Sequence, residues 1–427
     1  MARKESLPPT RWLWSIVLVL ALHLLSTAGT WWITDHGEIL AVAAGFLEHG
    51  RLDLKDLGPG WEDWERIVAA RPTADTRFLP LSILSLTPFL LIDHALGLRA
   101  PGALKVVHLQ GHFFVALALV IAGRFISRIA GTRAAALGVL LLGLNWPVWM
   151  IARRLGPEPL LLALVAGFMS GGALARFFCL ALLPWVHASG PLLAVGALAW
   201  LVVREGSIDA RALRPAAGCI LGVLSLALLW NLPVHGHLVL GGYDQYASDR
   251  FFTPRHPVVG VAGFAGALLA WTLPLAWLTA RGGKRVTIET LALFLPAVVF
   301  FGVFSSPEPA RRLAPLVAGW VILLMTRAAP VSARTAGALS LVSLASAVIG
   351  LSRDFVTLVE TPFGVYAGPH LLFMRMAFLD GHPWFAAGSV ALLVGTAVVA
   401  ARRVFGLLAE PTWGVGSNHA PGPELKA

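Results

Sequence analysis

Long apolar runs recur along almost the whole chain, and they limit the folds that it can adopt. Hydrophobic residues make up 57% and charged residues 13% of the 427 positions. A run of about 20 apolar residues is long enough to cross the hydrocarbon of a bilayer as a helix. The backbone must satisfy its own hydrogen bonds there, and runs of this length select helices over barrel strands. The sequence therefore predicts an all-α polytopic membrane protein and excludes a soluble globular domain.

The apolar runs predict about twelve transmembrane helices in one integral membrane domain, residues 1–406. The Pro/Gly-rich residues 407–427 are expected to form a disordered tail. We place the spans at 12–33, 103–124, 133–152, 158–175, 177–187, 190–203, 213–234, 257–280, 286–304, 313–328, 335–352 and 384–405. The short runs 177–187 and 190–203 meet at a polar Pro/Gly break, which is typical of a hairpin that reaches a cavity from the cytoplasmic side.

The segment 79–98 decides the topology. Its two prolines and its Asp93-His94 pair suit a broken interfacial helix better than a span. If 79–98 does not cross, most basic residues fall on one side, which the positive-inside rule assigns to the cytoplasm. We therefore predict an inner (plasma) membrane protein with both termini cytoplasmic, and the net charge of +10 needs no nucleic-acid partner. Three long loops then face the other side: 34–102, 235–256 and 353–383.

The first outer loop begins with two carboxylates at the surface end of a membrane helix. Asp35 and Glu38 are three residues apart, so on a helix they share a face. One of them would act as a general base, although capping of a helix N-terminus explains the same pair. Apolar residues at helical spacing predict an amphipathic helix over 36–48 that lies on the membrane, and Gly50 is well placed to end it.

Four further polar residues lie at span ends or in the hairpin. Glu158 follows Arg153-Arg154 in an outside turn, where an acid beside guanidinium groups suits phosphate or metal, or simply complements a helix dipole. Arg311 and Arg312 stand on the outer side against the positive-inside trend, so they require an anion such as a lipid phosphate or ordinary head groups. His187 lies in the polar break of the hairpin, either as a functional residue or as a satisfied buried one.

Taken in order, these segments resemble the GT-C fold of lipid-carrier-dependent glycosyltransferases of the protein O-mannosyltransferase and aminoarabinose-transferase type. Asp35, followed by 39–50, resembles the family's first-loop catalytic aspartate, and 80–97 resembles its interfacial segment. The turn 154–159 resembles the second-loop acidic site. Residues 231–254, with Tyr243, are similar to a loop after the seventh span of many bacterial members. Arg311-Arg312-Leu313-Ala314-Pro315 resembles the opening of a helix that faces the donor phosphate.

The resemblance implies transfer of a sugar from a polyprenyl-phosphate donor, embedded in the bilayer, to an acceptor on the extracytoplasmic side. Asp35 would be the general base. The implied substrate-binding residues are Glu38, Arg154, Glu158, His187, Tyr243, Arg311 and Arg312. Glu158 would orient the donor or hold a divalent cation, Mg²⁺ or Mn²⁺. The sugar and the acceptor are not specified by any motif. A transporter or lipid flippase, or a non-catalytic member of the same fold, remains an alternative.

Overall fold

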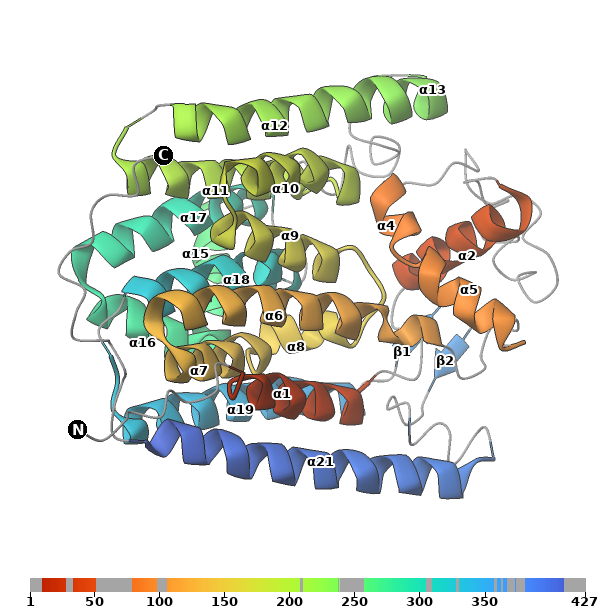
Figure 1. The fold of residues 1–427 in the computed structure, drawn as a ribbon. Helices are drawn as coiled ribbons and strands as arrows, with labels where there is room; N and C mark the ends of the chain where they lie inside the picture. The colour runs from red at the N-terminus through yellow and green to blue at the C-terminus, as the bar shows by residue number, and fades with distance from the viewer. Residues whose placement is uncertain are drawn as a thin grey trace.

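The computed structural model describes residues 10–27, 34–50, 79–97, 106–207, 210–236, 238, 257–304, 309–327, 330–356, 359–361, 364–366, 373 and 381–410. Most of these residues form helices that lie side by side in a bundle (Figure 1). The bundle helices are α1 (Leu13–Leu25), α6 (Gln110–Ala130), α7 (Thr132–Gly143), α8 (Trp146–Ala152), α9 (Glu158–Ser170), α10 (Ala173–Val186), α11 (Gly190–Glu205), α12 (Ala210–Leu226), α13 (Leu232–His235), α15 (Pro257–Trp271), α16 (Leu273–Arg281), α17 (Gly283–Val303), α18 (Pro309–Arg327), α19 (Ala333–Val356) and α21 (Pro383–Ala409).

A smaller group of elements sits at one end of the bundle, at the right in Figure 1. It consists of α2 (Thr34–His49), α4 (Pro80–Leu84), α5 (Thr87–Ala95), the 3₁₀ turn η1 (Val106–Leu109) and the strands β1 (Val359–Thr361) and β2 (Gly364–Tyr366). The two strands pair antiparallel, with Glu360 opposite Val365. A π-helical turn, η2 (Ala227–Asn231), joins α12 to α13.

The predicted multi-pass membrane protein is confirmed, and the count of twelve spans is not. Five described helices are long and apolar enough to cross a bilayer, or seven if each of two bent pairs is one span. The bends divide two predicted spans, 133–152 by 68° and 257–280 by 92°. Pro147 and Pro274 stand in the first turn of the second helix of each pair. Proline lacks the N–H that would continue the preceding helix, which explains both breaks.

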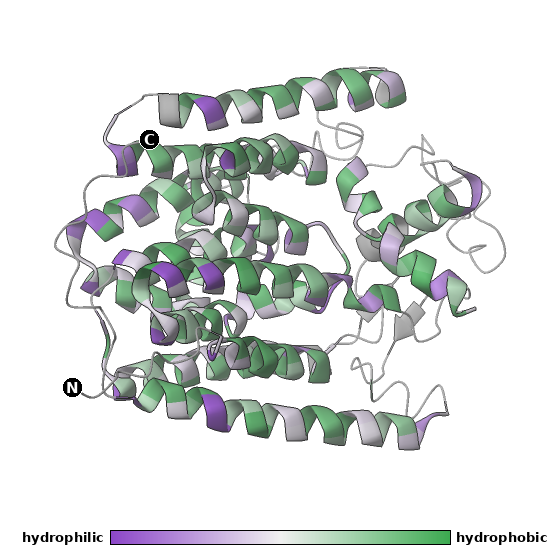
Figure 2. Ribbon diagram, in the orientation of Figure 1, coloured by the Kyte–Doolittle hydropathy of each residue, from purple (hydrophilic) through white to green (hydrophobic). Residues whose placement is uncertain are grey.

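Hydrophobic residues cover the bundle helices, and hydrophilic residues gather toward their ends (Figure 2). α18 lies at the centre, because its side chains from Leu313 to Leu324 are almost all buried. α21 lies along one edge of the bundle and continues to Ala409, three residues beyond the predicted domain boundary. The predicted tail 411–427 lies outside the described residues.

The first outer loop leaves the bundle and re-enters it at the same end. Thr27, just after α1, contacts His112 at the start of α6 with 3.0 Å between Oγ1 and Nε2. Between them, residues 79–97 form two short helices, as a broken segment predicts. The carboxylate of Asp93 accepts hydrogen bonds from the backbone of Val106 and Val107 and so anchors α5 to the start of η1. The segment therefore does not carry the chain across the bundle.

The predicted amphipathic helix is present as α2, and Gly50 follows it with φ of +68°. Glycine adopts this left-handed conformation without the steric cost that a side chain would add. Ala41 and Val42, off the predicted apolar face, are as fully buried as Ile39 and Leu40. They pack with α4 and α5 into a separate apolar cluster, so α2 is covered on more than one face by protein.

The start of α1 and the end of α21 lie at the opposite end of the bundle. Arg11 and Glu410 form an ion pair with 2.6 Å between Nη2 and Oε1. Arg133, at the start of α7, donates to the Glu410 backbone carbonyl. Arg204, Arg285 and Arg327 also lie at this end, around Glu289. Residues that the sequence assigns to the cytoplasm therefore share one end of the molecule.

Candidate functional site

A buried ion pair joins two of the predicted site residues, Glu158 and Arg311. Glu158 is the first residue of α9 and Arg311 lies in the first turn of α18. Arg311 Nε donates to Glu158 Oε1 over 2.5 Å, and both side chains are about 6–7% exposed. Pro157 and Pro159 flank the acid; proline suits a helix N-terminus because the N–H that it lacks would be unpaired there. Glu158 thus complements both the α9 dipole and the Arg311 charge.

The tip of the α10–α11 hairpin brings His187 to Arg312. His187 Nδ1 accepts a hydrogen bond from the Ser189 backbone N–H over 3.1 Å. Neutral His187 therefore carries its proton on Nε2, which lies 3.5 Å from Arg312 Nη1. Two donors face each other at this distance, and Arg312 Nε is buried without a hydrogen-bond partner among the described residues. An acceptor placed between them would be bound by both.

The turn before Glu158 is held by the start of α6. Gln110, which is fully buried, donates through Nε2 to the Gly156 carbonyl over 3.1 Å and to Ser85 Oγ over 3.2 Å. Gly111 lets the two segments approach, because a Cβ there would lie 2.5 Å from the Ala152 carbonyl oxygen. These contacts fix the turn that carries Arg154 and Glu158 against α4.

The helix that carries Asp35 packs beside this same turn. Leu155, in the turn, belongs to one buried cluster with Ile39 and Leu40 of α2. Asp35 and Glu38 lie in the first turns of α2. Their backbone position brings them to the end of the bundle that holds Glu158, and their side chains lie outside the described part of the structure.

Arg153 fixes the point where the chain leaves α1 for α2. Its Nε donates to the Ser26 carbonyl, and Trp149 Nε1 donates to the Ser26 hydroxyl over 2.6 Å. His23, one turn earlier, contacts the Gly143 carbonyl through Nε2 over 2.7 Å. This buried polar network ties the end of α1 to α7 and α8, and so positions the segment that precedes Asp35.

The structure thus brings Glu158, Arg311, Arg312 and His187 to one end of the bundle, with Arg154 in the turn that precedes Glu158. The same end holds the backbone of Asp35 and Glu38. Tyr243 lies outside the described residues. The roles of these residues in binding and catalysis stay predictions.

Sequence reasoning missed Gln110 and Arg153 as positioning residues. The sequence could have indicated Gln110, because a polar amide inside an apolar run is costly in a membrane and so is expected to have a specific partner. Arg153 offered none that separates it from Arg154, since only the fold shows which of the two points at the end of α1.

The predicted divalent cation at Glu158 would compete with Arg311 for the same carboxylate. Among the described residues, no group of three His, Cys, Asp or Glu side chains lies close enough together to hold a metal ion. Glu158 is therefore already paired with Arg311, and the divalent cation stays a prediction.

The described charges at this end favour an anion. Arg311 is neutralised by Glu158, whereas Arg312 meets another donor. Guanidinium groups bind phosphate through paired hydrogen bonds, and a partly buried site strengthens them. The described helices form a multi-pass membrane protein with the GT-C fold that the sequence predicts.

Two crystal structures of ArnT from Cupriavidus metallidurans are similar to this chain. The apo structure matches with a TM-score of 0.55 and 18% identity, over 93% of this chain and 73% of ArnT. The structure bound to undecaprenyl phosphate matches with a TM-score of 0.53 and 16% identity, over the same shares of the two chains. No family model and no curated protein sequence matches the chain. The likeness at this identity concerns the fold.

Proposed function

We propose that the protein transfers a sugar from a polyprenyl-phosphate donor to an acceptor on the extracytoplasmic side of the membrane. One observation carries this proposal. In a chain with the fold of ArnT, an arginine and a histidine present two facing donors at the end where the predicted base lies. The ArnT structure bound to undecaprenyl phosphate supports a lipid phosphate as the anion.

In the proposed reaction, an acceptor hydroxyl attacks the anomeric carbon of the sugar and the bond from that carbon to the phosphate oxygen breaks. Asp35 takes the hydroxyl proton as general base, and the sugar inverts its configuration. The polyprenyl phosphate leaves with the electron pair of the broken bond. Arg312 and the Nε2–H of His187 stabilise the negative charge that develops on the phosphate.

Glu158 and Arg311 have a supporting part in this proposal. Their pair fixes the first turns of α9 and α18 relative to each other, which positions the adjacent Arg312. Arg154 adds positive charge in the same turn, and Glu38 and Tyr243 contact the sugar or the acceptor. A divalent cation is given no step, because the described carboxylate is paired with Arg311.

The first experiment separates chemistry from lipid binding. Purified full-length protein in proteoliposomes is given a panel of undecaprenyl-phosphate-linked sugars, aminoarabinose included, and sugar release or transfer is measured. Asp35→Asn should abolish turnover and leave binding of undecaprenyl phosphate unchanged. Glu48→Gln is the control, because Glu48 is an exposed acid on the same helix. Unchanged turnover in Asp35→Asn would refute Asp35 as the base.

The second experiment tests the phosphate contacts. Arg312→Gln should weaken binding of undecaprenyl phosphate about tenfold or more, since a charge-assisted hydrogen bond is worth about 1.5–3 kcal/mol. His187→Gln should weaken it less, because the glutamine amide still offers a donor. Equal binding by wild type and Arg312→Gln contradicts the proposal, and movement of lipid between leaflets without any sugar transfer would favour a flippase.

A further inference from the structure

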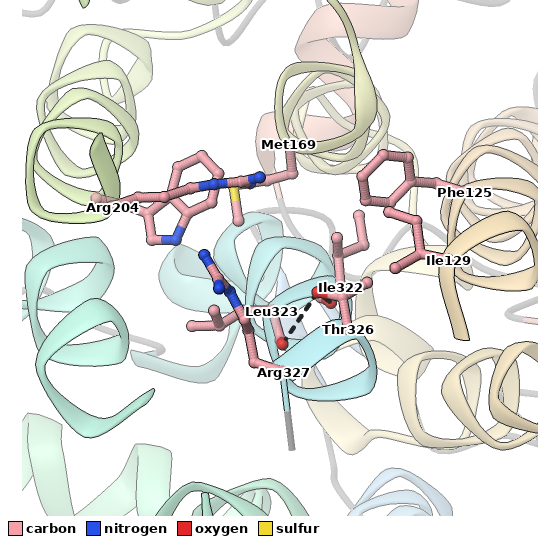
Figure 3. A pocket seen from close by; sticks show the side chains of 9 residues that line it. Phe125, Ile129, Met169, Arg204, Ile322, Leu323, Thr326 and Arg327 are labelled. Atoms are coloured by element: carbon pink, nitrogen blue, oxygen red, sulfur yellow. Dashed lines mark hydrogen bonds between the residues drawn. The ribbon is translucent and has the colours of Figure 1, made fainter. Parts of the chain in front are cut away.

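A positively charged pocket lies at the opposite end of the bundle from Glu158. It has a volume of about 200 Å³ and is enclosed by the final turns of α6, α9, α11 and α18. Figure 3 shows Arg204 and Arg327 extending into the same space from α11 and α18. The pocket is lined by Phe125, Ile129, Met169, Trp200, Arg204, Ile322, Leu323, Thr326 and Arg327.

The two arginines that line the pocket are not fully compensated. Their guanidinium groups make no hydrogen bond within the described part of the chain, and Arg204 and Arg327 lie close enough to repel each other. Arg327 Nη2 is 3.9 Å from Glu289 Oε1, and Arg204 Nε is 3.9 Å from Glu205 Oε1. Both separations are too long for a hydrogen bond. Each arginine therefore keeps unused donors beside the pocket.

The buried acid beside the pocket, Glu289, already has two hydrogen-bond partners. Glu289 is fully buried and accepts hydrogen bonds from Trp200 Nε1 over 3.2 Å and from Arg285 Nε over 3.3 Å. Arg176 adds a further positive charge near Arg204. Four arginines thus surround two glutamates, which leaves an excess of positive charge.

Helix dipoles do not remove this excess. Four helices end around the pocket with their partial negative charges, but α7, α10, α12 and α17 begin at the same end of the bundle with partial positive charges. Because the chain alternates in direction, these contributions partly cancel, and the charge of the arginine side chains stays in excess. The excess positive charge is therefore available to an external anion.

One arginine is also held in place. The guanidinium of Arg204 lies over the Trp200 ring, 5.1 Å from its centroid, and Glu289 fixes that ring through the indole N–H. A cation supported by an aromatic face loses less freedom when it binds an anion. The other wall is apolar, formed by Phe125 and Ile129 of α6 and by Met169, and Ile129 is itself 56% exposed on the bundle surface.

We propose that this pocket binds a phosphate anion, with Arg204 and Arg327 as its ligands. A lipid of the adjacent leaflet is the source that the apolar wall favours, because its acyl chains would lie along α6 while its phosphate reaches the arginines. Basic pockets between membrane helices on the cytoplasmic side commonly hold lipid phosphates in this way. A soluble phosphate ester carries the same group and would contact the arginines alone.

The test measures binding of two probes to the purified full-length protein in a neutral detergent. Native mass spectrometry counts bound phosphatidylglycerol at rising lipid concentration, and glycerol 3-phosphate is added as a competitor. We expect retained lipid in the wild type and about tenfold weaker binding in Arg204→Gln/Arg327→Gln, which loses two charge-assisted contacts. Arg402→Gln/Arg403→Gln is the matched control, because these two exposed arginines lie on α21 outside the pocket.

Further results decide the proposal. Arg312→Gln should retain the lipid, and loss of it there would place the lipid at the other end of the bundle. Displacement of the lipid by millimolar glycerol 3-phosphate would support the phosphate site, whereas wild-type protein that binds glycerol 3-phosphate and retains no phosphatidylglycerol would overturn the lipid as its source. Equal binding by the wild type and Arg204→Gln/Arg327→Gln would overturn the site itself. If that variant does not fold, Thr326→Trp fills the pocket and keeps both arginines. Unchanged lipid binding by Thr326→Trp would also overturn the site.

Discussion

The buried pair of Glu158 and Arg311 gives the sharpest prediction on stability. Removing one partner of a buried ion pair leaves an uncompensated charge and costs about 3–5 kcal/mol. Both side chains here are about 6–7% exposed, and Nε and Oε1 are 2.5 Å apart. Arg311→Met should therefore lower the free energy of unfolding by about 3–5 kcal/mol. Glu158→Gln/Arg311→Met should cost about 2–3 kcal/mol less than the sum of the two single changes, because neither charge remains.

The molecule contains a matched control for this measurement. Arg11 and Glu410 are 2.6 Å apart, almost the same separation, but their side chains are 30% and 31% exposed. Water screens such a pair, whose net contribution is about 0–1 kcal/mol. The same three variants at this pair should therefore give a coupling energy close to zero, against about 2–3 kcal/mol at the buried pair.

The assay is reversible unfolding of the purified protein in mixed micelles, with increasing dodecyl sulfate and helix content followed by circular dichroism. Each variant is compared with the wild type at the same mole fraction of dodecyl sulfate. The double-mutant cycle then isolates the pairwise energy from effects of the individual substitutions. A coupling energy at Glu158 and Arg311 no larger than that at Arg11 and Glu410 would refute the argument from burial.

Three further changes have defined outcomes. Gln110→Leu removes a donor from the buried Gly156 carbonyl and should lower the free energy of unfolding by about 1–3 kcal/mol in the same assay, whereas wild-type stability would contradict the assigned contact. Gly156→Ala places a Cβ 2.7 Å from Glu158 Oε2, so the carboxylate must move, and binding of undecaprenyl phosphate should weaken measurably in a titration. Glu289→Gln keeps an acceptor for the Trp200 indole but removes the negative charge near Arg327, so phosphatidylglycerol should bind more tightly in native mass spectrometry. Weaker binding there would oppose a phosphate ligand.

The membrane class, the positions of most helices and the broken segment 79–98 follow from hydropathy and proline placement alone. These properties are local, so a sequence carries them directly. Gly50 is an example, because a glycine after an apolar helical pattern predicts the end of α2 where the structure has it.

The partners inside the site could not be predicted in the same way. The topology placed Glu158, Arg311 and Arg312 on one side, but Glu158 and Arg311 are 153 positions apart and nothing local selects that pair. The contact of Gln110 could not be predicted, because a single amide in an apolar run does not indicate which carbonyl it will bind.

The lengths of two predicted spans were wrong because a proline divides each of them into two helices. The sequences 133–152 and 257–280 read as continuous helices, and the structure bends each of them at a proline. The pocket at Arg204 and Arg327 was missed for a different reason. Its arginines belong to separate loops that the positive-inside rule already explained, so no unexplained charge remained to be noticed.

The central position of α18 links the two ends of the molecule mechanically. The helix has 19 residues and so measures about 28 Å, with Arg311 and Arg312 near its start and Arg327 at its end. Deleting one residue from its middle would turn one end by about 100° relative to the other and pull it inward by about 1.5 Å. Because α18 is enclosed by other helices, the arginines at its two ends could then no longer both keep their positions. The peripheral α21, mostly exposed within this chain, has far more room for a change in length.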